Sequence, residues 1–345
     1  MLPLISRYKL VDHRRLLQLI AIGAIAFLLL PRIVGFERVL GSLRNANMMY
    51  VTLALIAESA RHMLSAGETY ALTHLFKRRV PYAPLVQAFF AGAALNRTFS
   101  VGGAPGMALR VLFLTRQGLT VGSVAAIFLI ENIGGVVTGV LVTIVGVVMV
   151  TSEHAPRALV VNGGGAFIVG ILLIVLGALV LLRRRAWVER IVHTLARWAD
   201  RVLHRFTGSA ILTPERVQRG VNDLYTGLDA VQRAPQFFGV ILALNLLRDV
   251  AGVAGLYFAF LALGWSISPA ILMLAYTSAN MLTTTSAAPG EVVILGSGLA
   301  LFSVALGVPR EIALAGLLLW RALAFWLPIL VGYAALWNLG RRRYL

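Results

Sequence analysis

The sequence predicts an all-α polytopic membrane protein, organised as an inverted-topology repeat with about six spans and two re-entrant helical hairpins. Three observations support this fold class. The 345 residues are 59% hydrophobic and 13% charged, whereas a soluble domain carries about 25% charged residues. Several apolar runs approach the ~20 residues that cross a bilayer. Two matched polar stretches, 96–106 and 280–290, interrupt these runs, and arginine-rich clusters separate them.

The two matched stretches share the pattern N-x7-A-P-G, and each follows a long apolar segment. Irregular backbone inside a bilayer is tolerated only where protein or a water-filled cavity covers it. A pair of Gly/Pro interruptions in the two halves of a chain is typical of a transporter's central site. The sequence therefore predicts two hairpins that meet near the middle of the membrane. The predicted breaks are Pro105, Gly106, Pro289 and Gly290.

The arginine-rich clusters assign the ends of the apolar segments to the cytoplasm, by the positive-inside rule. The net charge of +17 would also attract anionic lipid. Two full spans separate the clusters at 77–79 and 183–185, so the segment 84–119 must enter and leave from the cytoplasm. The same count of membrane crossings predicts that the segment 268–309 enters and leaves the membrane from the outside. Both termini are predicted to be cytoplasmic, in the cytoplasmic membrane of a prokaryote.

A single membrane domain, 1–345, is expected to hold two repeats that start in opposite directions. Between them, apolar residues at helical spacing alternate with arginines from 183 to 219. This pattern fits a helix at the inner membrane surface or a solvated connector helix. The predicted elements are a span at 16–34, a first repeat at 48–150 (span 48–72, hairpin 84–119, span 120–150), a connecting region at 164–234 that begins with the span 164–182, and a second repeat at 237–336 (span 237–263, hairpin 268–309, span 312–336).

Ionisable residues inside the spans are costly in lipid, so they indicate either internal ion pairs or a substrate path. Glu58 and Arg61 are three residues apart on one helical face, and Arg248 directly precedes Asp249, so both pairs fit a structural role. Four other charges show no partner nearby along the chain, which favours substrate contact: Arg110, Arg321, Glu131 and Glu291. Two asparagines either contact substrate or satisfy the broken backbone. The candidate substrate-binding residues are Arg110, Arg321, Glu131, Arg61, Glu58, Arg248, Asp249, Glu291, Asn96 and Asn280.

The breaks and the arginines together indicate an anionic substrate. A helix that begins at a break points its N-terminal N–H groups, with their positive partial charge, into the protein centre. Guanidinium groups beside it bind phosphate bidentately. An anion that crosses while its apolar remainder stays in lipid is a phospholipid. Arginine and glutamate would then hold the phosphate and balance the charge or contact a cationic headgroup.

These residues resemble the lysylphosphatidylglycerol synthase transmembrane-region proteins, also called flippase-like membrane proteins, from about residue 16 to 339. The resemblance implies lipid translocation or scrambling across the cytoplasmic membrane. Members fused to a soluble aminoacyl-transferase domain also synthesise the lipid, and no such domain is expected here. Three positions depart from the family pattern: Met107-Ala108, Asn132 after Glu131, and Glu291 after Pro289-Gly290. The motifs that carry the resemblance are GAPG at 103–106 with Arg110, Ile130-Glu131, SAAPGEVVILGSGLALFSVALGV, and LLLWRALAFWLPILVGY with Arg321, Phe325 and Trp326.

The sequence thus predicts a flippase or scramblase that moves an anionic or zwitterionic phospholipid through a central polar cavity. No P-loop pattern is present, so transport is passive or coupled to an ion or proton. One alternative is a secondary transporter of a small anionic solute. Another is an integral membrane lipid-modifying enzyme, although no catalytic motif, metal site or cofactor site is found and the cysteine count is zero. The expected partners are membrane phospholipids and no nucleic acid, and a homo-oligomer or a separate lipid-modifying enzyme stays open.

Overall fold

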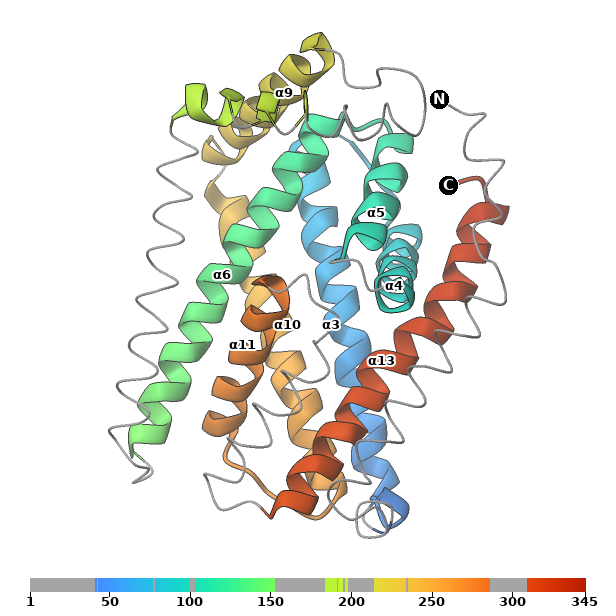
Figure 1. The fold of residues 1–345 in the computed structure, drawn as a ribbon, viewed down its shortest axis with the longest axis vertical. Helices are drawn as coiled ribbons and strands as arrows, with labels where there is room; N and C mark the ends of the chain where they lie inside the picture. Colours follow the sequence, from blue (N-terminus) through green and yellow to red (C-terminus); the bar gives the residue numbers. More distant parts are fainter. Residues whose placement is uncertain are drawn as a thin grey trace.

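The computed structural model describes residues 41, 43–76, 78–99, 103–152, 184–190, 192–194, 196–197, 214–233, 235–285 and 309–345. Every regular element in that part of the chain is helical, which confirms the all-α class (Figure 1). The helices are α3 (Met48–Leu75), α4 (Tyr82–Thr98), α5 (Ala104–Arg116), α6 (Val121–Ser152), α9 (Pro214–Gln232), α10 (Pro235–Ala262), α11 (Pro269–Thr285) and α13 (Arg310–Arg341).

Several sequence predictions fall on residues that the structure does not describe. The spans predicted at 16–34 and 164–182 lie outside the described residues, as does most of the second half of the hairpin at 268–309. The second break and the acid that follows it are among them. These three site predictions are Pro289, Gly290 and Glu291.

Three helices of the described residues are long and apolar enough to cross a membrane: Val121–Val150, Gln236–Ala262 and Ile312–Arg341. The chain is therefore a membrane protein by helix length and composition. At 28 residues, α3 is also about 42 Å long, which exceeds the ~30 Å hydrocarbon core. Its composition sets it apart from the other three, because its sequence includes four ionisable residues in its middle turns: Glu58, Arg61, His62 and Glu68.

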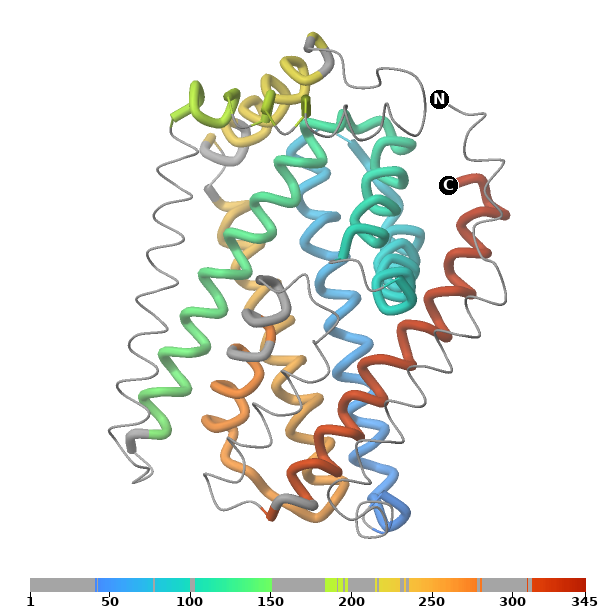
Figure 2. Tube along the Cα trace, in the orientation of Figure 1, coloured from blue at the N-terminus to red at the C-terminus, as the bar shows by residue number. Residues whose placement is uncertain are grey.

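The helices α3, α6, α10 and α13 have 28 to 32 residues each and run the length of the molecule, whereas α4, α5 and α11 occupy only part of it (Figures 1 and 2). α3 and α13 run toward the end where α9 lies, whereas α6 and α10 run away from it. α4 and α5 stay in the half nearest α9, so this pair of helices returns to the end from which it enters. α11 starts at the opposite end and ends near the middle of the molecule.

The α4–α5 turn is shaped by small residues and one asparagine. α4 ends at Thr98, and α5 begins at Ala104 after Gly103, whose φ of 77° is a left-handed conformation suited to glycine. The Gly106 N–H donates to Asn96 Oδ1 over 2.6 Å. Asn96 therefore satisfies a backbone donor at the start of α5, which is one of the two roles expected from the sequence.

The position of the break differs from the one predicted. We expected Pro105 and Gly106 to end the first half-helix, but both lie inside the first turn of α5. Proline suits that turn because the first N–H groups of a helix have no intrahelical acceptor and its φ is already helical. Proline opens other helices of this chain in the same way, at Pro214, Pro235 and Pro269.

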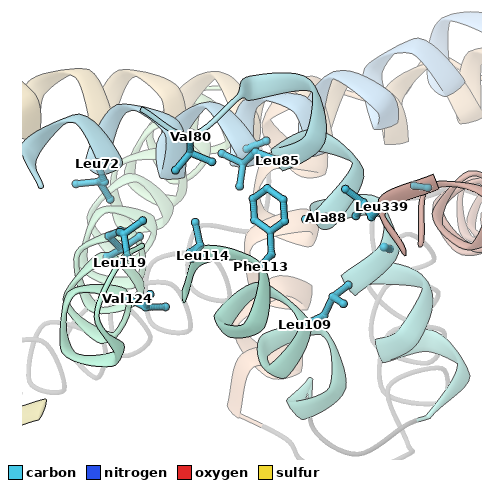
Figure 3. Packing of buried hydrophobic residues seen from close by; sticks show 14 of the residues in the cluster. Leu72, Val80, Leu85, Ala88, Leu109, Phe113, Leu114, Leu119, Val124 and Leu339 are labelled. Atoms are coloured by element: carbon cyan, nitrogen blue, oxygen red, sulfur yellow. The ribbon is translucent and has the colours of Figure 1, made fainter. Parts of the chain in front are cut away.

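Two apolar cores hold the shorter helices against the long ones. The first surrounds α5, where Phe113 and Leu114 are fully buried against α3, α4, α6 and the end of α13 (Figure 3). The second surrounds α11, where Leu272 and Tyr276 pack with α10 and α13. Large apolar side chains on the outer faces of the long helices are exposed instead, as expected for surfaces that meet lipid. Examples are Leu141, Val148, Leu247, Val250 and Leu330.

We predict that Gly106→Ala destabilises the protein by about 1–3 kcal/mol, because the added methyl group has no room. It would lie 2.5 Å from both Asn96 Nδ2 and the Gly92 carbonyl oxygen. The matched control is Gly239→Ala in α10, where nothing lies within 4 Å of the added carbon. Thermal unfolding in detergent measures both variants. An unchanged unfolding temperature for Gly106→Ala would contradict the close α4–α5 crossing.

Candidate functional site

The inner face of α3 carries the charges that the apolar helices surround. Glu58 is 0% exposed and Glu68 is 1% exposed, and both side chains turn away from the lipid-facing side. Thr69 and His62 share this buried face. Isolated charges cannot remain in such a setting, so the partners of each one define the structure of the site.

The first ion-paired cluster joins α3 to α13. Arg61 Nε lies 2.9 Å from Glu58 Oε2, so the pair predicted from their spacing is confirmed. The indole Nε1 of Trp320 donates to the other oxygen, Glu58 Oε1, over 2.9 Å. Gly255 on α10 lies against the same carboxylate, since a carbon added there would be 3.5 Å from Oε1. Both oxygens of this buried carboxylate are therefore satisfied by groups from two helices.

The second cluster joins α3, α5 and α6 around one guanidinium. Arg110 Nη2 donates to Glu131 Oε2 over 2.8 Å and to Oε1 over 3.0 Å. It also lies 2.8 Å from Thr69 Oγ1, whose hydroxyl donates to Glu131 in turn. The guanidinium carbon lies over the rings of Phe89 and Phe128, at 4.1 and 4.4 Å from their centroids. Two aromatic faces and one carboxylate thus compensate this charge.

Arg110 uses little of its hydrogen-bonding capacity. All three of these hydrogen bonds involve Nη2, and the buried Nε has no hydrogen-bond partner among the described residues. A guanidinium offers five N–H donors in a fixed fork, so this one has unused donor positions. A buried donor without an acceptor raises the free energy of the folded state. An anion with several oxygens would satisfy the unused donor.

The third cluster joins α3, α6 and α10. Arg248 Nη1 lies 3.3 Å from Glu68 Oε1, and Arg248 Nη2 lies 3.3 Å from Asp249 Oδ1. Thr138 on α6 donates to Asp249 Oδ2 over 2.9 Å. The Arg248–Asp249 pair expected from the sequence is confirmed. Asn245 is fully buried one turn earlier on α10, and its Oδ1 accepts no hydrogen bond in the structure.

The three clusters are close enough to interact electrostatically. The buried Tyr276 on α11 lies close enough to act electrostatically on both Arg61 and Arg248, and Asp249 acts on both arginines as well. Glu68 lies within electrostatic range of Arg110 and Glu131 in the second cluster and of Arg248 and Asp249 in the third. The described clusters hold the guanidiniums of Arg61, Arg110 and Arg248 and the carboxylates of Glu58, Glu68, Glu131 and Asp249. Fully ionised, these clusters would carry one more negative charge than positive.

Four other predicted site residues in the described part of the chain fall into two groups. Arg110 and Glu131 have no oppositely charged neighbour close in the sequence. In the structure they form an ion pair with each other, although 21 residues separate them. Arg321 is half-buried on α13, directly after Trp320, and Asn280 on α11 hydrogen-bonds Tyr276. Among the described residues no group of three or more His, Cys, Asp or Glu side chains could hold a metal ion.

Sequence reasoning missed the polar residues that complete the clusters. These are Glu68, Thr69, Thr138, Asn245 and Trp320. One signal was present: Asn245-x-x-Arg248-Asp249 has the same spacing as Glu58-x-x-Arg61-His62. No comparable signal exists for Thr138 or Trp320, because a threonine or tryptophan in an apolar helix is ordinary.

A second polar region lies at the α9 end of the molecule. Residues 185–190 are helical, and Arg185 Nη2 donates to Asn222 Oδ1 of α9 over 2.5 Å. Hydrogen bonds from Arg185 and then Gln218 hold the pKa of the Glu189 carboxyl below its ordinary value. Trp187 is 58% exposed beside them. This solvent-facing pair of Arg185 and Glu189 offers a surface control for the buried pairs.

We predict that Arg110→Met destabilises the protein by about 3–5 kcal/mol, because it leaves Glu131 buried without a counter-charge. Arg110→Met combined with Glu131→Gln should cost less than the single Arg110 change, since no isolated charge remains. Thermal unfolding of the wild type, both single variants and the double variant gives a coupling free energy of about 0.5–3 kcal/mol. Single-variant costs that simply add would show that the pair is not energetically coupled.

Comparison with known proteins places the chain in a family. The family described as the lysylphosphatidylglycerol synthase TM region matches residues 16–332. The UPF0104 membrane protein PH1989 of Pyrococcus horikoshii is 23% identical over 319 residues, which cover 91% of this chain and 94% of that protein. The matched region includes all three ion-paired clusters. The resemblance inferred from the sequence motifs is confirmed, and the chain belongs to the lysylphosphatidylglycerol synthase TM region family.

Proposed function

We propose that this protein translocates an anionic or zwitterionic phospholipid between the leaflets of a prokaryotic cytoplasmic membrane. The observation that carries the proposal is the guanidinium of Arg110, whose side chain is 19% exposed and whose buried Nε has no hydrogen-bond partner among the described residues. The family name also supports a lipid substrate, since lysylphosphatidylglycerol is a phospholipid. A lipid can reach such a site from within the bilayer while its acyl chains stay in the hydrocarbon.

The chemistry of the clusters suits exchange between a carboxylate and a phosphate. Guanidinium binds both anions with the same planar fork, so a phosphate can take the place of Glu131 on Arg110 with little geometric change. Such exchange keeps a counter-charge on the arginine at every stage. The arginine is then never isolated in a low-dielectric setting, where it would cost many kcal/mol.

An inverted-topology repeat is part of the proposal, and three helix pairs support it. α3 and α10 both have 28 residues, α4 and α11 both have 17, and α6 and α13 both have 32. Their first residues are 187, 187 and 189 positions apart, from 48 to 235, 82 to 269 and 121 to 310. The partners in each pair run in opposite directions (Figure 1). A repeat of this kind places its substrate site where the two halves meet.

The repeat also makes Arg61 and Arg248 equivalent, because they too are 187 positions apart. α3 and α10 pack along much of their length, and Tyr276 lies within electrostatic range of both arginines. Equivalent arginines on oppositely directed helices offer the same anion-binding group to each side of the membrane. Rocking of one repeat against the other would then expose the site alternately.

We predict that neutralising the Arg110–Glu131 pair slows lipid translocation at least tenfold. The variant Arg110→Gln/Glu131→Gln removes the guanidinium without leaving a buried charge, so the fold is retained. Fluorescent phospholipids in proteoliposomes, quenched from outside, measure the rate for several headgroups. The matched control is Arg185→Gln/Glu189→Gln, which neutralises an ion pair on the surface.

Each outcome of this assay decides between functions. Wild-type speed in the folded Arg110→Gln/Glu131→Gln variant would remove Arg110 from the mechanism. A wild-type rate equal to that of protein-free vesicles would reject lipid translocation. Uptake of a small phosphate- or carboxylate-bearing solute by the same vesicles, without lipid movement, would instead support the solute transporter.

A further inference from the structure

In the cluster of Glu68, Arg248 and Asp249, the carboxylates of Glu68 and Asp249 share the single guanidinium of Arg248. Arg248 lies 3.3 Å from an oxygen of each acid. Glu68 is 1% exposed and Asp249 is 5% exposed. Two buried carboxylates that share one positive charge do not both ionise easily, so such a site binds a proton readily.

The two acids differ in how firmly they are held. Asp249 accepts a hydrogen bond from Thr138 over 2.9 Å in addition to its contact with Arg248. Within the described residues, both hydrogen bonds to Glu68 come from Arg248 Nη1, at 3.3 and 3.5 Å. Glu68 therefore depends on Arg248 alone, and it is the acid that loses its counter-charge when another anion binds Arg248.

The cluster also contains an acceptor that lacks a donor. A carbon added to Gly135 of α6 would lie 3.2 Å from Arg248 Nη2 and 3.3 Å from Asn245 Oδ1, so both groups face the same point. Asn245 is 0% exposed, and its Oδ1 accepts no hydrogen bond from any residue that the structure describes. A protonated carboxylic acid brings an O–H donor into the cluster, whereas a carboxylate brings only acceptors.

Other charged groups on the neighbouring helices lie close enough to act electrostatically on Glu68. They are Arg248 and Asp249 on α10, Glu131 on α6 and Arg110 on α5. Two of these groups are positive and two are negative, so their charges sum to zero while Arg248 is paired with Glu68. When Arg248 is occupied by a phosphate, the balance around Glu68 becomes negative, and a proton is the simplest compensation.

We propose that Glu68 is a proton-binding site that couples proton movement to phospholipid movement. A lipid phosphate binds Arg248, and the released Glu68 carboxylate takes one proton from the aqueous side to which the site is open. The proton leaves when the phosphate departs on the other side and Glu68 returns to Arg248. This inference rests on the proposed lipid translocation, and one proton accompanies each phosphate in the same direction.

Proteoliposomes with a pH gradient test the coupling. The vesicles are phosphatidylcholine with a trace of fluorescent phosphatidylglycerol. With one proton per lipid, a gradient of one pH unit should shift the leaflet ratio up to about tenfold, toward the alkaline side. Glu68→Gln should abolish this shift, while the surface variant Glu189→Gln keeps it. A wild-type ratio that stays at one while lipid still equilibrates would overturn the coupling and leave lipid translocation standing.

A direct measurement separates this inference from the transport proposal. Infrared difference spectra of the reconstituted protein, recorded on addition of phosphatidylglycerol, should show a carboxylic acid C=O band that Glu68→Gln lacks. The band should remain in Glu189→Gln. If no lipid moves in any vesicle, lipid translocation is rejected, and the infrared band still decides whether Glu68 binds a proton. The absence of a band that depends on Glu68 would reject Glu68 as the proton site.

Discussion

The cost of leaving a charge alone inside apolar helices constrains the whole arrangement of this protein. Each of the arginines at positions 61, 110 and 248 lies within hydrogen-bonding distance of a carboxylate, and two of those pairs connect different helices. The shorter helices α5 and α11 are needed for this reason. α5 brings Arg110 to Glu131, and α11 brings Tyr276 within electrostatic range of the two remaining arginines. Ion pairing therefore accompanies apolar packing where these helices cross.

The same constraint makes the pairs suitable for function. A buried ion pair contributes little net stability compared with an apolar replacement, because desolvation offsets most of the attraction. Its partners can therefore be exchanged for a ligand of the same charge at a modest cost in free energy. Among the described residues, Arg110 of the second cluster retains a donor without an acceptor, and Arg248 of the third cluster serves two acids. The second cluster lies between α3, α5 and α6, and the third lies between α3, α6 and α10.

Features encoded by neighbouring residues could be predicted from the sequence. The ion pairs Glu58–Arg61 and Arg248–Asp249 are confirmed by the structure. They could be predicted because three residues or fewer separate their members. The all-helical class and the family also follow from composition and short motifs. The inverted repeat, the span count and the roles of the site residues stay predictions.

Contacts between distant residues could not be predicted. Trp320 and Glu58 are 262 residues apart, and Arg248 and Glu68 are 180 apart, so no local pattern connects them. The exact start of α5 also depended on tertiary contacts, since Asn96 and Gly92 fix where its first turn crosses α4. Pro105 and Gly106 indicated that the backbone changes direction near them. They did not indicate that both residues belong to the helix that follows the turn.

Native mass spectrometry of the purified protein tests most directly whether the buried arginines hold a lipid phosphate. In a detergent that removes loosely attached lipid, the wild-type protein should retain at least one phospholipid. The variant neutralised at Arg110 and Glu131 should lose it, and the variant neutralised at Arg185 and Glu189 should keep it. Equal lipid retention by all three folded proteins would contradict the account.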